Sequence, residues 1–290
     1  MSTSHPTTGR AASLPATLRL GPAHIDVTDL ERSLGFYEPA LGLRVLRRED
    51  GVAALGTDDQ DVVVLRERPG ARRAGRHAGL YHVALLYPSR EELAREAMRL
   101  IATETPVDGA SDHGTHEAIY LSDPDSNGLE LAADRPREQW PSYEQMYAGG
   151  PAPLDFRDLL ATVMDEPARQ YAGPGLRVGH VHLYVGDVDR GLAFYHEVLG
   201  FDVMANLGSA AFVSAGGYHH HLAFNIWRGA GVPPVPEGVV GLRHWTVELG
   251  DAEAFAALRE RLAAAGVDHE ERDGGLLVRD PWGIAVLITG

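Results

Sequence analysis

The chain has 290 residues, of which 44% are hydrophobic and 23% charged, a composition typical of globular proteins. Its formal net charge of −15 argues against nucleic-acid and anionic-membrane partners, and no apolar run is long enough for a transmembrane helix. Cysteine is absent, which excludes disulfides, thiolate metal sites and a cysteine nucleophile and fits a cytoplasmic protein. We therefore expect a small-molecule partner or another copy of the chain, and any metal must have nitrogen and oxygen ligands.

Strand-then-helix units follow one another along the first half. Residues 1–17 lack the apolar segment of a secretory signal and are predicted to be a disordered lead-in. The first unit is "GPAHIDVTDLERSLGFYEPALGLRV" (21–45), and the second is "GLYHVALLYPSREELAREAMRL" (79–100), whose apolar residues recur at helical spacing. Short β-rich segments complete each unit. Residues 136–175, rich in proline, glycine and charge, are predicted to be a linker with one helical stretch, "PLDFRDLLATVMDE".

The second half of the chain repeats the first. The stretch "GHVHLYVGDVDRGLAFYHEVLGFDV" (179–203) matches residues 21–45 without a gap, and "GLRHWTVELGDAEAFAALRERL" (241–262) is again a strand followed by a helix. A match this long indicates an internal duplication. The sequence therefore predicts an α+β fold of four βαβββ modules, with modules 1 and 2 in a domain 18–135 and modules 3 and 4 in a domain 176–290. Four residues are predicted to N-cap the helices: Asp29, Ser89, Asp187 and Asp251.

Modules that open on "H-x-x-x-x-x-x-D" before "FY…LG" and close on "DP-x-x-x-G-x-E" resemble the vicinal-oxygen-chelate superfamily. That superfamily includes glyoxalase I, fosfomycin-resistance proteins and extradiol ring-cleavage dioxygenases. The resemblance implies that modules pair into two cupped-sheet barrels and hold a divalent metal. It also implies ligands on the first strand of a module, seven residues before the helix cap, and on its last strand. Because this fold carries several chemistries, the resemblance specifies the fold better than the reaction.

Four residues at these positions can bind a metal: His82, Glu130, His180 and His244. Module 1 instead offers Pro22, and module 4 has Leu287 where its carboxylate is expected. We expect modules 2 and 3 to pair around one metal held by His82, Glu130 and His180, because pairing in chain order gives two incomplete sites. Two histidines and one carboxylate form the ligand set of non-haem Fe(II). In this pairing His244 has no assigned role.

The segment "DHGTHEAIYLSDPDSNGLE" resembles the catechol 2,3-dioxygenase signature, in which a tyrosine precedes the glutamate ligand by ten residues. Tyr120 matches that tyrosine, and His113, rather than His116, matches the signature's histidine. In the usual dioxygenases this module follows the one with the other histidine ligand, so the resemblance implies a permuted module order.

The run "YHHHLAF" resembles the dioxygenase strand that carries a histidine beside the metal, and His220 falls at that position. If the run is a strand, alternation turns His219 and His221 away from the cup. His182, two residues after the ligand His180, would share its face and could bind substrate.

The resemblance thus implies extradiol cleavage of a catecholic aromatic by O₂ at Fe(II), with Mn(II) as a substitute. His220 would stabilise the oxygen, His113 would exchange a proton, and Tyr120 would hydrogen-bond a substrate oxygen. A glyoxalase-type lyase or isomerase stays open, although its fourth ligand is expected where the histidine run stands. A non-catalytic, drug-sequestering protein also stays open, although such proteins lack metal ligands. Exposed sheet edges further predict a homo-oligomer.

Overall fold

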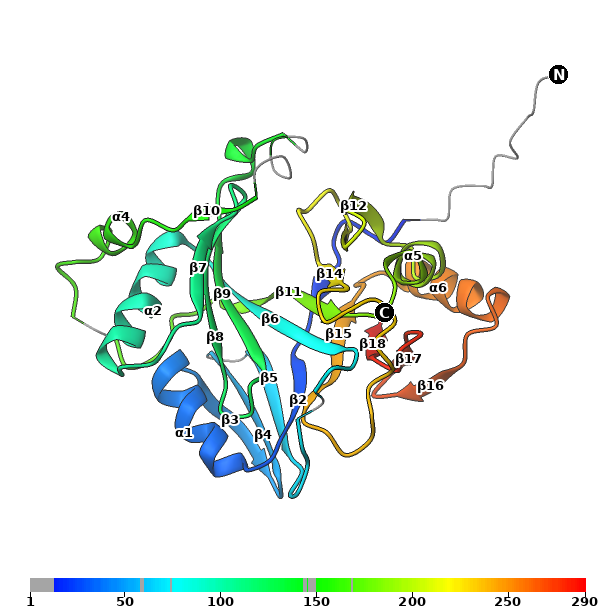
Figure 1. The fold of residues 1–290 in the computed structure, drawn as a ribbon, viewed down its shortest axis with the longest axis horizontal. Coiled ribbons are helices and arrows are strands. Elements are labelled where there is room, and N and C mark those ends of the chain that lie inside the picture. Colours follow the sequence, from blue (N-terminus) through cyan, green and yellow to red (C-terminus); the bar gives the residue numbers. More distant parts are fainter. Residues whose placement is uncertain (1–12, 58–59, 74, 143–144, 146–149, 168) are drawn as a thin grey trace.

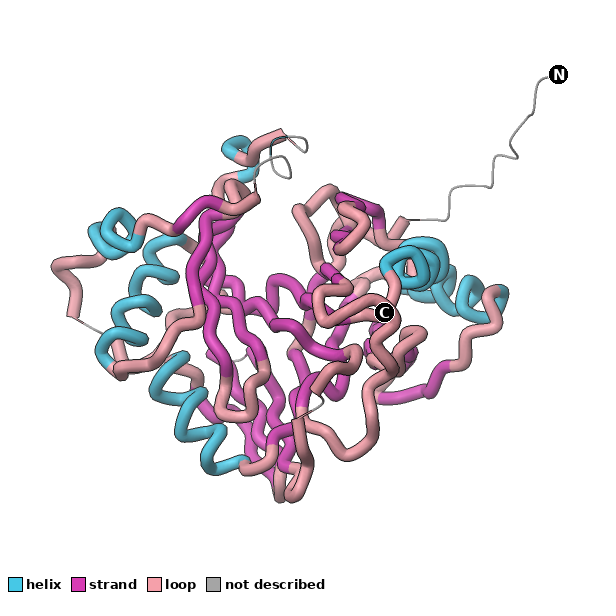
Figure 2. Tube along the Cα trace, in the orientation of Figure 1, coloured by secondary structure: helices cyan, strands magenta, loops and turns pink. Residues whose placement is uncertain are grey.

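The computed structural model describes residues 13–290 except 58–59, 74, 143–144, 146–149 and 168. Helices lie on the two outer flanks and strands fill the space between them (Figures 1 and 2). Most of the predicted lead-in lies outside the described residues, but in its described part Leu14 is buried and donates its backbone N–H to the carbonyl of Gly200. Within the described chain, no helix is both long and apolar enough to cross a membrane.

One nine-stranded sheet combines the first and last modules of the chain. Its order is β16-β17-β18-β15-β2-β5-β4-β3, and β1 also pairs with β15. The helices of these modules are α1 (Leu30–Leu41) and α6 (Ala252–Ala264). The strands are β1 (Arg19–Leu20), β2 (Ala23–Val27), β3 (Arg44–Glu49), β4 (Val52–Thr57), β5 (Gln60–Glu67), β15 (Gly241–Glu248), β16 (His269–Arg272), β17 (Gly275–Arg279) and β18 (Ala285–Thr289).

A second nine-stranded sheet combines the two middle modules, in the order β10-β7-β8-β9-β6-β11-β14-β13-β12. Its helices are α2 (Arg90–Ala102) and α5 (Val188–Leu192), which continues into a π-helical turn at Ala193–Val198. The strands are β6 (Gly79–Tyr87), β7 (Gly109–Asp112), β8 (His116–Ser122), β9 (Gly128–Asp134), β10 (Ala152–Pro153), β11 (Arg177–Tyr184), β12 (Asp202–Asn206), β13 (Ala210–Ser214) and β14 (Leu222–Asn225).

Both sheets are mixed, with parallel and antiparallel pairs, and the predicted α+β class is confirmed. Each sheet takes strands from both halves of the chain, so the strand order cuts across the predicted division into 18–135 and 176–290. The predicted linker contains a short 3₁₀ helix, η1 (Arg137–Gln139), and strand β10. It also contains α4 (Phe156–Ala161), where the sequence predicted one helical stretch.

Local capping explains where the module helices begin. Each cap side chain accepts a hydrogen bond from a backbone N–H of the first helical turn: Asp29 from Arg32, Ser89 from Glu92, Asp187 from Arg190, and Asp251 from Glu253 and Ala254. An N-cap of this kind contributes roughly 1 kcal/mol. The four predicted caps are therefore confirmed.

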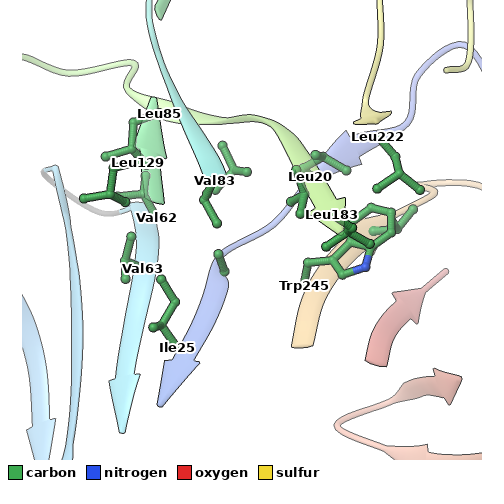
Figure 3. Close-up of a cluster of buried hydrophobic side chains, with 14 of the residues drawn as sticks. Leu20, Ile25, Val62, Val63, Val83, Leu85, Leu129, Leu183, Leu222 and Trp245 are labelled. Atoms are coloured by element: carbon green, nitrogen blue, oxygen red, sulfur yellow. The ribbon is translucent and has the colours of Figure 1, made fainter. Parts of the chain in front are cut away.

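The two sheets share one hydrophobic core. Val83 and Leu183 of the second sheet lie in the same cluster as Ile25, Val63 and Trp245 of the first (Figure 3). Burying each such aliphatic side chain stabilises the fold by about 1.5–3 kcal/mol. Because side chains alternate along a strand, the residues between these core positions face the other side of each sheet. The candidate functional side chains lie on those two faces.

Candidate metal centre

The outer face of the second sheet, here called the 2–3 cup, gathers the three predicted ligands. His82 lies on β6, Glu130 on β9 and His180 on β11, and each is at most 5% exposed. The Nε2 atoms of His82 and His180 lie 2.9 and 3.2 Å from Oε2 of Glu130, and 3.2 Å from each other. Three chain-distant side chains thus converge on one point.

This geometry fits a divalent metal. Ligand atoms about 2.1 Å from an ion and at right angles to one another lie about 3.0 Å apart, close to the three separations seen here. The face of such a set that points to the pocket remains open for other ligands. Burial alone would raise the pKa of the Glu130 carboxyl, but the His180 and His82 imidazoles hold that pKa well below its usual range. The site therefore favours the carboxylate that a metal requires.

A third histidine contacts the same glutamate. His116, at the start of β8, places its Nε2 3.1 Å from Oε1 of Glu130 and its Nδ1 2.9 Å from the hydroxyl of Thr115. With Asp134 and His219 it forms a second group whose nitrogen and oxygen atoms lie within 4.8 Å of one another. Both Asp134 oxygens already accept from the Tyr218 hydroxyl, and one also lies 3.0 Å from Nε2 of His219. We therefore treat this group as support for the ligands.

The histidine run lies in the bend that precedes β14, and β14 begins only at Leu222. Strand alternation does not apply there, so His219 and His220 both line the pocket over the triad. The prediction that His219 faces away from the cup is therefore wrong. His221 lies instead against the hydroxyl of Ser214, 2.9 Å from its Nδ1.

His220 lies directly beside the triad. Its ring centroid is 4.1 Å from that of His180, and its Nδ1 lies 2.9 Å from Nδ1 of His219. Since Asp134 holds the far nitrogen of His219, a chain of contacts runs from this carboxylate through His219 to His220. Burial, followed by neighbouring imidazoles, lowers the pKa of His220 well below its usual value.

His113 and Tyr120 form a hydrogen-bonded pair across the β7–β8 hairpin. Nε2 of His113 lies 2.7 Å from the Tyr120 hydroxyl, and Tyr120 pairs in register with Glu130. Burial lowers the pKa of His113 to about 4 and raises that of Tyr120. At neutral pH this combination is an uncharged imidazole next to a protonated phenol.

His182 lies on the predicted face of β11 and lines the same pocket, which has a volume of about 370 Å³. Its Nε2 accepts a hydrogen bond from the side-chain amide of Asn225 at 2.8 Å, so the imidazole ring is fixed. Tyr81 and Trp227 pack around it, with ring centroids 4.9 and 5.4 Å away, and Phe212 lies opposite at 6.1 Å. The wall beside the ligands is therefore aromatic.

Sequence reasoning gave little weight to His116 and missed Asp134, Tyr81 and Trp227. His116 lies four residues before Tyr120 on one strand, so alternation alone places it on the same face and could have found it. Tyr81 could not be found in this way. It stands at a register shift between β6 and β11, where an extra residue breaks the alternation.

Comparison with known proteins places this geometry in a family. The model of the Glyoxalase/Bleomycin resistance protein/Dioxygenase superfamily matches residues 19–131 and 177–288. A protein named catechol-2,3-dioxygenase from Bacillus subtilis (strain 168) is 40% identical over 275 residues, which cover 93% of this chain and 96% of that protein.

Solved structures show the same fold at low identity. A protein from Bacillus subtilis subsp. subtilis str. 168 superposes with a TM-score of 0.62 and 16% identity, covering 96% of this chain and 86% of its own. Glyoxalase I from Zea mays gives a TM-score of 0.57 and 18% identity, with 94% and 92% covered. The family model and the B. subtilis sequence together show that the chain belongs to the glyoxalase/bleomycin resistance protein/dioxygenase superfamily.

Proposed function

We propose that this chain is an extradiol ring-cleaving dioxygenase that acts on a catecholic aromatic with O₂. The observation that carries this proposal is the open triad of His82, Glu130 and His180, with His220 on one side and the Tyr120–His113 pair on another. The 40% identity with the B. subtilis catechol-2,3-dioxygenase over nearly the whole chain supports the same reaction.

The module order is part of the proposal. Modules 2 and 3 would pair around the metal and modules 1 and 4 would form the half without metal, as a permuted dioxygenase requires. The strand order supports this arrangement, because β6 and β11 are antiparallel neighbours and carry the two histidine ligands.

The donor set suits a redox-active divalent ion. Bound to His82, Glu130 and His180, Fe(II) supplies the electron transfer and Lewis acidity that ring cleavage by O₂ needs, and Mn(II) accepts the same ligands. The chain's own task is then to bind and orient the catechol, exclude water and move protons. The aromatic wall of Tyr81, Trp227 and the His182 ring fits a flat substrate ring.

Four polar side chains have roles in this proposal. Tyr120 accepts a hydrogen bond from a catechol O–H, and as it takes up that proton its own hydroxyl proton passes to Nε2 of His113 across the 2.7 Å contact. His220 would stabilise the reacting oxygen from its place beside His180, and the Asp134–His219 contact fixes its ring. His182 binds substrate through its ring face, because Asn225 occupies its Nε2.

A glyoxalase-type reaction is less well supported. Such enzymes use four ligands, and within the described residues the ligand atoms of the triad gather without His220. The likeness to Zea mays glyoxalase I, at 18% identity, extends to the fold alone.

The test is anaerobic loading of the purified protein with Fe(II), followed by catechol and air. A yellow ring-cleavage product should form, and it should form more slowly or not at all with Zn(II), which cannot cycle between oxidation states. An iron-loaded protein that binds catechol and leaves it intact would contradict the proposal. Assembly as a homo-oligomer and a cytoplasmic location remain predictions, for sedimentation and cell fractionation to test.

A further inference from the structure

The outer face of the first sheet, here called the 1–4 cup, corresponds to the 2–3 cup of the second sheet. Beside His244 this cup continues into a pocket of about 980 Å³, which residues of module 2 such as Leu80 and Asn127 also line. Six arginines and three carboxylates line this pocket. The arginines are Arg68, Arg73, Arg228, Arg243, Arg272 and Arg279, and the carboxylates are Asp26, Asp125 and Glu237. In a chain with a formal net charge of −15, a concave surface with an excess of cations is unusual.

Two of the three carboxylates are already paired. Asp26 accepts from Arg68 at 2.9 Å, and Asp125 is held by Arg32, outside the pocket lining, and by Thr28. Arg243, by contrast, has no hydrogen-bond or ion-pair partner among the residues that the structure describes. The cationic excess is therefore available to a ligand.

The arginines also repel one another. Burial lowers the pKa of Arg243, and the nearby Arg66, Arg272 and Arg68 guanidinium groups lower it further, against an opposing effect of Asp26. Among the described residues, the Arg272 guanidinium has one ion-pair partner, the exposed carboxylate of Asp273 at 3.4 Å. A bound anion would relieve this repulsion, since it places negative charge between the guanidinium groups.

The floor of the pocket has buried polar atoms without partners. His244 is 2% exposed and stacks on His24 with ring centroids 3.9 Å apart, and its Nε2 has no hydrogen-bond partner in the described structure. The second carboxylate oxygen of Asp26 also lacks a partner there. Buried polar groups are nearly always hydrogen-bonded, so both atoms point to a polar ligand or its water.

The walls are apolar and fixed. Leu80, Leu242, Leu277 and Val239 line the pocket beside the charged groups. The segment that contains Val239 is anchored to Arg72, whose N–H donates to the Gly238 carbonyl and whose carbonyl accepts from Val240. A ligand with an apolar body and a charged end matches this mixed lining.

We infer that the 1–4 cup binds a small organic anion, with its carboxylate or phosphate group held by Arg243 and Arg272 and its apolar part against Leu242 and Leu277. Arginine recognises both groups through paired N–H donors. The inference does not depend on ring cleavage, because none of these residues lies in the 2–3 cup.

The test is calorimetric titration of the metal-loaded protein, at constant ionic strength, with benzoate, inorganic phosphate and neutral benzamide. We expect one benzoate or phosphate per chain and at least tenfold weaker binding of benzamide. Tighter binding of benzoate indicates a carboxylate ligand, and tighter binding of phosphate a phosphorylated one. His82→Ala should bind the anion as wild type does, which separates this site from the metal.

The double variant Arg243→Met/Arg272→Met keeps the apolar stems and removes the charges. We expect this variant to bind the anion at least tenfold more weakly, with unchanged metal content and ring cleavage. The control is Arg48→Met, on the exposed edge strand β3, which should bind the anion as wild type does. Unchanged affinity in a double variant that melts like wild type, or benzamide binding as tight as benzoate, overturns the inference. If the double variant does not fold, Arg279→Met must weaken binding for the inference to stand. A wild-type dimer that binds no anion and dissociates in the double variant would instead assign the cup to a second copy.

Discussion

The 2–3 and 1–4 cups are built on the same strand register and carry different chemistry. In the 2–3 cup, His82 pairs with His182 and Ala84 with Glu130. In the 1–4 cup, His244 pairs with His24 and Thr246 with Leu287, so the duplicated backbone presents equivalent positions in both. Pro22 and Leu287 stand in the 1–4 cup where the 2–3 cup has His180 and Glu130, so a few side chains decide which cup offers three candidate metal ligands. The arginines line a neighbouring pocket.

The paired histidines show how those side chains act on each other. In the 2–3 cup the His82 and His182 rings meet edge to face, with centroids 5.0 Å apart, because His82 turns toward Glu130. In the 1–4 cup no carboxylate draws His244 away, and it stacks on His24 at 3.9 Å. The pair thus supplies a candidate ligand, His82, and a pocket wall, His182, in one cup, and a packed floor in the other.

The largest expected effect is loss of the metal from variants of the 2–3 cup. His82→Ala, Glu130→Ala and His180→Ala should each abolish metal retention and ring cleavage, because each removes one of the three proposed ligands. Their melting in the metal-free state should stay close to wild type, since the core lies on the other face of the sheet. Metal analysis of anaerobically purified protein measures this, and wild type should hold one metal per chain.

His244→Ala is the matched control, because this residue occupies in module 4 the position that His82 occupies in module 2. It should retain the full metal content and activity. Loss of metal in His244→Ala with retention in Glu130→Ala would show that the modules use their ligands in chain order.

The next effect concerns His220, whose ring lies beside that of His180. His220→Ala should keep near-normal iron content and catechol binding while turnover falls by roughly 10²–10³, as expected for one positioned polar group. The measurement is kcat and KM on iron-matched protein. His221→Ala should cost much less, because its ring lies against Ser214. An iron-depleted His220→Ala would make this residue a fourth ligand and favour the glyoxalase-type reaction.

A smaller effect is expected from the contact that orients His220. Asp134→Asn removes the carboxylate charge beside Nε2 of His219, which lies 3.0 Å from Oδ1 of Asp134. It should lower kcat by roughly 10–100-fold with little change in KM or metal content. Asp134→Glu should recover part of the rate. Equal losses in both variants, accompanied by a lower melting temperature, would indicate that Asp134 acts only in folding.

The sequence predicted the modules, their caps and the three candidate ligands, because duplication and capping are local signals that survive without knowledge of packing. The sequence did not predict the positions of side chains that depend on irregular backbone. The bend before β14 brought His219 into the pocket, and the register shift at Tyr81 added an aromatic wall. Residues far apart in the chain line the arginine pocket, so no single sequence segment could predict it.

Adding metal ligands to the 1–4 cup tests whether its strand register is sufficient to bind a metal. Pro22→His/Leu287→Glu, together with the native His244, recreates the triad at equivalent register positions, and the chain should then bind a second metal. The nearby arginines should make this site weaker than the first. Titration with Mn(II) measures the stoichiometry, with Leu287→Glu alone as the control. A stoichiometry that stays at one would mean that backbone register does not suffice.

The smallest expected effect is a change in pH dependence. Burial lowers the pKa of His244 to about 3 and that of His24 to about 4, both below the ordinary 6.5. Between pH 6.5 and 4 the unfolded chain therefore binds more protons than the folded one, so acidification lowers the free energy of unfolding. Each fully shifted histidine contributes about 1.4 kcal/mol per pH unit to the slope of the free energy of unfolding.

His244→Phe keeps the stacked ring and removes one titrating group, so this slope should become shallower by about that amount. Urea unfolding of metal-free protein across this range measures it, and parallel slopes for variant and wild type would show that His244 already titrates normally in the folded state.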